Sequence, residues 1–279
     1  RESGVLPGNP WQHKIQYKKN YQELDTLFTG ESGFEAGYRF RIGDDVDADG
    51  MKSIRAVVEQ PALWQVSING HPVTPVEGEC WIDRDFPVFE IGEFLVTGEN
   101  ILSLTAPRMT IHSELSPVYI LGDFLVKPAE KGFEIAKGDL SAPGSWRETG
   151  LPFYSQKVSY SRQFDLAGNK GSGYKVSLGN WSGSVAEVKV NGISAGLIAW
   201  KPYELDITDC VREGPNEITV TVTGSLKNAF GFFYHKNDSW IFGPFSWNKA
   251  PDKMPVASEY FLMDYGLMEP FGVFKTSMN

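Results

Sequence analysis

Two stretches of the chain share one pattern, Trp64-Gln-Val-Ser-Ile-Asn-Gly-His71 and Ala186-Glu-Val-Lys-Val-Asn-Gly-Ile193. In each stretch apolar and polar residues alternate, which is the period of a β-strand that buries one face. Each then reaches Asn-Gly, a pair that tolerates positive φ at both central positions of a type I′ turn. The pattern therefore predicts a β-hairpin in each half of the chain.

The similarity between the two halves extends in both directions from these hairpins. The order of the matched segments is the same in both halves, and the spacing changes only at loops. The further matches are Phe40–Ile42 with Phe164–Leu166, Phe89–Leu104 with Leu205–Val220, and Asp123–Val126 with Pro270–Val273. Such a repeat indicates two copies of one fold.

Several short alternating strands separated by turn residues favour a β-sandwich or a jelly roll. With 279 residues, of which 41% are hydrophobic and 22% charged, the chain is long enough to bury two such cores. We therefore predict an all-β protein made of two tandem β-sandwich domains. We expect a lead-in or linker at residues 1–30, the first β-sandwich at 31–130 and the second at 145–279.

The two copies differ most in one connection, which is short in the first copy and runs over residues 224–264 in the second. Long connections are usually functional or are packed against something. This one is rich in aromatic residues, which a solvated loop would not normally carry. Sugar rings can pack on aromatic rings, so we predict carbohydrate binding there and at a nearby turn. The candidate carbohydrate-binding residues are Trp200, Tyr234, His235, Trp240 and Trp247.

Core packing is the alternative for each tryptophan. For Trp64, which lies on an alternating strand, the pattern favours the core. For Trp200, Trp240 and Trp247, at loop positions, both interpretations stay open. Trp81 and Trp181 are further candidates for sugar stacking.

Motifs for catalysis are weak in this chain. Gly192-Ile-Ser194-Ala-Gly196 matches the G-x-S-x-G pattern of serine hydrolases, but it follows a hairpin instead of joining a strand to a helix, so we expect a turn. The four histidines have no metal-ligand spacing. Among the 35 acidic residues no pair stands out as the two facing carboxylates of a glycosidase. We predict no catalytic residue, no metal ligand and no cofactor.

Asp45-Val-Asp47-Ala-Asp49-Gly50 is similar to the start of a calcium-binding loop. A twelve-residue EF-hand loop would place Ala56 at its last ligand position, which excludes that motif. A structural calcium site of another kind and an acidic, solvated loop between two strands stay open as alternatives.

The net charge of −9 leaves the chain without the basic patch that a nucleic-acid binder needs. No apolar run is long enough to span a bilayer, so we expect no membrane span. Two cysteines, Cys80 and Cys210, are too few for a disulfide framework. Because the chain begins at Arg1, we expect it to be a processed or excised part of a longer protein.

The stretch Leu178-Gly-Asn-Trp-Ser-Gly-Ser-Val-Ala-Glu-Val-Lys-Val-Asn-Gly192 resembles the galactose-binding-like jelly roll of large bacterial glycoside hydrolases. Its continuation through Trp200-Lys-Pro-Tyr203 and Gly214-Pro-Asn216 has the same character, as does Trp64–Gly70. The resemblance is strongest to the C-terminal region of glycoside hydrolase family 106, the α-L-rhamnosidase-like proteins, often from gut Bacteroidetes. It covers roughly residues 30–279.

This resemblance implies two galactose-binding-like jelly rolls that accompany a catalytic barrel lying elsewhere. The chain would then be a non-catalytic accessory region of an extracellular or periplasmic carbohydrate-active enzyme. Its partners would be a plant or host polysaccharide and a missing catalytic domain, so it would bind glycan or act as a scaffold. Two alternatives stay open: a glycoside hydrolase with a carboxylate pair between the sandwiches, and a protein-interaction module that uses the loop at residues 224–264.

Overall fold

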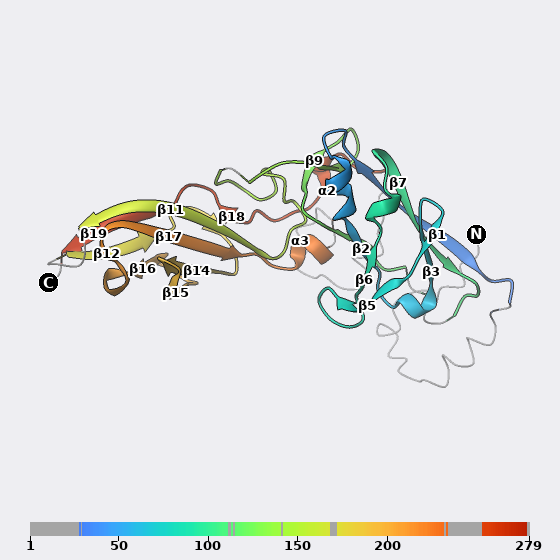
Figure 1. The fold of residues 1–279 in the computed structure, drawn as a ribbon, viewed down its shortest axis with the longest axis horizontal. Helices are drawn as coiled ribbons and strands as arrows, with labels where there is room; N and C mark the ends of the chain where they lie inside the picture. Colours follow the sequence, from blue (N-terminus) through green and yellow to red (C-terminus); the bar gives the residue numbers. More distant parts are fainter. Residues whose placement is uncertain are drawn as a thin grey trace. The chain divides into compact units, whose positions relative to one another are not determined.

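The computed structural model describes residues 28, 30–110, 113, 115–140, 142–167, 172–231, 233 and 253–277. Almost every regular element among them is a β-strand, which confirms the predicted all-β class (Figure 1). The described chain divides into two compact units. Unit 1 contains the described residues up to Asp139 together with 253–259, and unit 2 contains those of 140–233 and 260–277.

Unit 1 is built from two β-sheets. The six-stranded sheet has the order β4 (His71–Val73), β3 (Gln65–Ile68), β7 (Gly98–Ala106), β1 (Phe34–Ile42), β10 (Phe133–Ala136) and β9 (Leu125–Pro128). The second has the order β5 (Pro75–Cys80), β6 (Pro87–Glu90), β2 (Arg55–Val57) and β8 (Tyr119–Leu121). Their alternating apolar residues form one core around Ile42, Ile68, Phe89 and Leu102. Trp64 is half-buried against this core, which confirms its predicted place.

Short helical segments join the strands of unit 1. They are α2 (Ala48–Lys52), the 3₁₀ segments η1 (Pro61–Leu63) and η2 (Gly92–Phe94), and η4 (Ala257–Glu259). The last of these lies in the long connection that the sequence pattern assigns to the second sandwich. Next to it Gly132 and Val256 form a parallel bridge, and the Gly132 N–H donates to the Pro255 carbonyl at 2.8 Å. This part of the connection therefore packs with unit 1.

Unit 2 contains three sheets. A four-stranded sheet has the order β11 (Lys157–Ala167), β17 (Glu213–Thr223), β14 (Val185–Val190) and β15 (Ile193–Ile198). A three-stranded sheet has the order β16 (Glu204–Asp206), β12 (Ser172–Ser177) and β19 (Gly272–Ser277), and β13 (Trp181–Ser182) pairs with β18 (Gly266–Leu267). The helical segments are η3 (Thr208–Cys210) and α3 (Lys227–Phe230). The core of the unit includes the fully buried Trp146, Val188 and Val220.

The two units pair their equivalent strands in the same register. Phe40 faces Asn100 across β1 and β7, as Phe164 faces Asn216 across β11 and β17. The hairpins are also equivalent, since Ile68 pairs with His71 and Val190 with Ile193. Both turn positions have positive φ in each hairpin: 49° and 83° at Asn69-Gly70, and 52° and 83° at Asn191-Gly192. The two predicted hairpins are therefore confirmed, with the turn geometry expected of Asn-Gly.

The last match of the predicted repeat, Asp123–Val126 with Pro270–Val273, is wrong. Val126 lies in β9, which pairs with β10, whereas Val273 lies in β19, which pairs with β12. The counterpart of β19 is β8. Ile120 of β8 pairs with Ala56 of β2, just as Val273 of β19 pairs with Val176 of β12. Short apolar runs match one another easily, so sequence alone assigned the wrong strand here.

A fully buried asparagine fixes the turn region of unit 1. The Asn100 Oδ1 accepts from Asn69 Nδ2 at 2.8 Å and from the Val96 N–H at 2.9 Å. Its Nδ2 donates to the carbonyls of Val96 and Gly98, at 2.7 and 3.2 Å. The Asn69 Oδ1 in turn accepts from the Ile101 N–H at 2.9 Å. This asparagine pair thus ties the β3–β4 turn to the loop that leads into β7.

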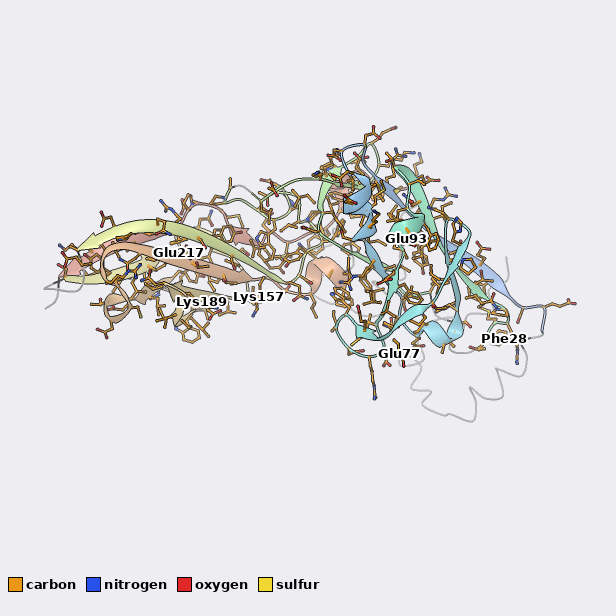
Figure 2. The ribbon with its side chains drawn as sticks, viewed as in Figure 1. Phe28, Glu77, Glu93, Lys157, Lys189 and Glu217 are labelled. Atoms are coloured by element: carbon orange, nitrogen blue, oxygen red, sulfur yellow. The ribbon has the colours of Figure 1, made fainter. Side chains whose placement is uncertain are left out.

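Unit 2 repeats each of these hydrogen bonds. The Asn216 Oδ1 accepts from Asn191 Nδ2 and from the Arg212 N–H, both at 3.0 Å. Its Nδ2 donates to the carbonyls of Arg212 and Gly214, at 2.7 and 2.9 Å. The N–H of Glu217, a residue labelled in Figure 2, donates to Asn191 Oδ1 at 3.1 Å. Each unit therefore satisfies equivalent backbone groups with the same two side chains.

No helix among the described residues is long and apolar enough to cross a membrane.

We predict that Asn216→Ala lowers the free energy of unfolding by roughly 2–4 kcal/mol, because it removes a fully buried side chain and leaves the Arg212 and Gly214 backbone groups without this partner. Urea unfolding measures the change. Ser161→Ala is the matched control, since its exposed hydroxyl pairs only with Thr219 at 2.8 Å in the same strand pair. Equal stability of the two variants would contradict the structural role of Asn216.

Candidate functional site

Of the five predicted carbohydrate-binding residues, Trp200 lies among the described residues. Tyr234, His235, Trp240 and Trp247 lie outside them. Trp200 follows β15, and 79% of its surface is exposed. Of the two interpretations left open for Trp200, the structure therefore excludes core packing.

Three connected segments of unit 2, residues 178–184, 199–203 and 268–271, are here called the three-loop end; the second of them carries Trp200. The Leu178 N–H donates to the Tyr203 carbonyl at 3.1 Å. The Asn180 N–H donates to Glu269 Oε1 at 2.8 Å, and the Met268 N–H donates to the Asn180 carbonyl at 3.0 Å. Hydrogen bonds thus join all three loops, including the loop that carries Trp200.

A second tryptophan belongs to the three-loop end. The ring of Trp181 meets that of Tyr203 edge-on, with centroids 5.4 Å apart and an interplanar angle of 86°. Both rings are half-buried. The Nε1–H of Trp181 is buried and finds no acceptor among the described residues. A buried donor of this kind is a place where an added acceptor gains a full hydrogen bond.

The described ends of the long connection are joined at their base. The Asn228 side chain is fully buried; its Nδ2 donates to the Met263 carbonyl at 2.8 Å, and its Oδ1 accepts from the Met263 N–H at 2.9 Å. Further along, the Phe261 N–H donates to the Phe233 carbonyl at 2.7 Å. We call the region of these pairs the loop base. In it, hydrogen bonds hold the first and last described parts of the connection side by side.

Aromatic rings and one lysine fill the loop base. Phe233 packs against Phe153 with centroids 5.4 Å apart, and Tyr260 lies 6.1 Å from Phe153. Lys227 Nζ donates to the Phe261 carbonyl at 2.8 Å and lies 4.6 Å from the centroid of that ring. Burial of the ammonium group lowers the pKa of Lys227 to about 8. The sequence does not predict these contacts, because Phe153 lies far from the long connection in the sequence and outside any periodic pattern.

We predict that wild type gains stability relative to Lys227→Met as the pH rises from 7 to 10. The folded pKa lies below that of an unfolded lysine, so the unfolded state binds more protons over this window. As Lys227 loses its proton in the folded state, the free-energy cost of burying its charge is progressively removed. Unfolding titrations of both proteins at several pH values measure the difference. A stability difference that stays constant with pH would contradict the prediction.

The acidic stretch of unit 1 is exposed to solvent, as one of the two sequence-based alternatives has it, and its second half forms a short helix. Asp47 caps this helix, α2, since its Oδ1 accepts from the Gly50 N–H at 2.8 Å. Lys137 Nζ lies 2.6 Å from Asp47 Oδ2, and this bond holds the pKa of that carboxyl below its usual range. Asp45 and Asp49 also face lysines, at 3.3 and 3.2 Å. No arrangement of three or more His, Cys, Asp or Glu residues suited to a metal occurs in the described part of the chain.

The free edge of the four-stranded sheet in unit 2 is apolar. On its edge strand β15, Ile193 is 71% and Leu197 64% exposed. Ser194, the serine of the G-x-S-x-G match, lies within this strand and not at a strand-to-helix turn. The equivalent edge strand in unit 1, β4, carries Pro72, a residue that blocks further strand pairing. Unit 2 therefore exposes an edge that unit 1 protects.

Comparisons with known proteins give no family for this chain. No family model matches it, and no curated protein matches it. Among solved structures, it is similar to a rhamnosidase from Novosphingobium sp. PP1Y, with 19% identity and a TM-score of 0.35, over 88% of this chain and 22% of that one. An α-L-rhamnosidase from Streptomyces avermitilis in complex with L-rhamnose has 14% identity and a TM-score of 0.28, over 70% and 22%.

A third similar structure is an FMN-binding β-glucuronidase from Facaelibacterium prausnitzii L2-6. It has 20% identity and a TM-score of 0.27, over 55% of this chain and 21% of that one. The present chain thus spans about a fifth of the length of these solved structures. Similarities at this level assign no activity to it.

Proposed function

We propose that this chain is a non-catalytic accessory region of a carbohydrate-active enzyme, and that its three-loop end binds glycan. The observation that carries the proposal is the 79% exposed ring of Trp200, presented by loops that hydrogen bonds hold in place. Contact between water and a large aromatic ring is unfavourable. An exposed ring on a loop held by hydrogen bonds therefore favours a ligand that covers it.

The three-loop end carries the kinds of groups that suit a sugar. Its ring offers an apolar face to the C–H groups of a pyranose, while hydroxyl groups need charged or amide partners close by. Glu269, Lys201 and Asn180 are exposed residues of the same three loops. Aromatic stacking surrounded by a few polar groups is typical of binding sites for neutral glycans.

The wider proposal rests on the sequence resemblance. Two galactose-binding-like jelly rolls, similar to the C-terminal region of family 106 glycoside hydrolases, would accompany a catalytic domain outside this chain. The glycan would be a plant or host polysaccharide, met outside the cell or in the periplasm. We assign no catalytic residue to the chain.

A second candidate function is docking of another protein domain at the β15 edge. Ile193 and Leu197 are exposed there on a strand with one unpaired side. An extended segment of a partner could add to this edge as a further strand, with its apolar side chains covering these two residues. In this case the chain would serve as a scaffold for the missing catalytic domain.

A glycan array that includes rhamnose- and galactose-containing plant polysaccharides separates the two functions. We predict that wild type binds at least one glycan, and that Trp200→Ala weakens the affinity at least tenfold, which corresponds to about 1.4 kcal/mol. The double variant Ile193→Ser/Leu197→Ser is the control, because it removes the apolar edge and keeps Trp200. A folded wild-type chain that binds no glycan would contradict the glycan proposal and favour the scaffold.

A further inference from the structure

Unit 1 carries an aromatic group that the proposed function does not use. The rings of Trp81 and Tyr119 lie 5.0 Å apart at an angle of 46°, and Phe86 lies 6.3 Å from Tyr119. All three are half-buried, so each keeps part of its surface open to solvent. Trp81 and Phe86 flank the turn between β5 and β6, and Tyr119 begins β8.

This aromatic group occupies the place in unit 1 that the three-loop end occupies in unit 2. β2 pairs with β6 and β8, as β12 pairs with β16 and β19. The aromatic group lies where the chain enters β6 and β8, and the three-loop end lies where it enters β16 and β19. The repeated fold therefore places aromatic residues at the equivalent end of both units.

The turn that carries Trp81 is held rigidly by its own hydrogen bonds. The Trp81 N–H donates to the Phe86 carbonyl at 3.0 Å, and the Phe86 N–H donates to the Asp83 carbonyl at 3.1 Å. The Asp85 N–H donates to Asp83 Oδ1 at 2.8 Å. The Gln60 N–H then donates to the Asp85 carbonyl at 3.2 Å, which fastens the turn to the neighbouring loop. A ligand would find these rings already in position, which lowers the entropy cost of binding.

Gln60 has a left-handed backbone, with φ of 50°, which residues other than glycine seldom adopt. Glycine would adopt this backbone conformation without strain, yet the chain has a glutamine here, and its side chain is exposed. Unfavourable backbone conformations of this kind persist mainly at functional sites. Glu59 precedes Gln60 and lies two residues after Val57, which pairs with Tyr119 across β2 and β8. Burial, and to a lesser degree the Glu59 carboxylate, raises the pKa of Tyr119.

We propose that Trp81, Tyr119, Glu59 and Gln60 form a second carbohydrate subsite, on unit 1. The subsite rests on the proposed function, because it would bind a further pyranose ring of the same class of glycan. The Trp81 and Tyr119 rings would take the C–H face of the sugar. The Gln60 amide and the Glu59 carboxylate would exchange hydrogen bonds with its hydroxyl groups. Two subsites on one chain raise the avidity for a polymer without any new contact at either site.

The full chain is titrated with rhamnogalacturonan fragments, and tryptophan oxidation is mapped by mass spectrometry with and without the glycan. We expect the glycan to protect Trp81 in wild type and also in Trp200→Ala. We expect Trp81→Ala to weaken binding to the polymer at least fivefold. Ile82→Ala, a partly exposed neighbour in the same turn, is the matched control and should bind as wild type does.

Gln60→Gly separates a binding role from a structural one. This variant relieves the left-handed backbone, so we expect a higher unfolding temperature together with at least threefold weaker binding. A structural role alone would leave its affinity unchanged. If wild type binds the glycan while Trp81 stays unprotected and both Trp81→Ala and Gln60→Gly bind normally, the second subsite is excluded. If wild type binds no glycan, the proposed function itself fails, and the subsite with it.

Discussion

The buried asparagine pairs, Asn69–Asn100 and Asn191–Asn216, are the constraint on which both units depend. In each pair a fully buried asparagine binds the backbone of the loop before a long strand, and its partner is a left-handed residue in a hairpin turn. With that turn fixed, the neighbouring strands have one register only, because a slip of one residue would turn every apolar side chain outward. The shared hydrogen bonds therefore explain why β1 and β7 pair in the same register as β11 and β17.

A register fixed at one end of the strands leaves the other end free to vary. In unit 2 that end carries Trp200, Trp181 and Tyr203 on loops joined by hydrogen bonds. In unit 1 the equivalent end carries Trp81 and Tyr119 on a turn of different length. Rigid strands that present variable loops are a common way to build binding sites. The repeat thus supplies the scaffold, and the loops supply what differs between the two units.

The sequence predicted what depends on local pattern. Alternation of apolar residues and the Asn-Gly pairs were enough to predict the all-β class and both hairpins. The loop base around Asn228 and Phe153 was not predictable, because it joins residues distant in the sequence through contacts that no period records. The assignment of Val126 failed because short strands of similar composition are interchangeable in sequence. The sequence does not decide whether Trp200 lies in the core or at the surface, because periodicity describes strands and says nothing about the loops after them.

Native-state hydrogen exchange tests the central claim most directly, that matched asparagine pairs hold both units in register. The backbone amides of Val96, Ile101, Arg212 and Glu217 all donate to these side chains although they lie in or beside turns. We predict that all four exchange as slowly as amides in the centres of β7 and β17. Exchange of these amides at the rate of exposed loops, in either unit, would contradict this role of the asparagine pairs.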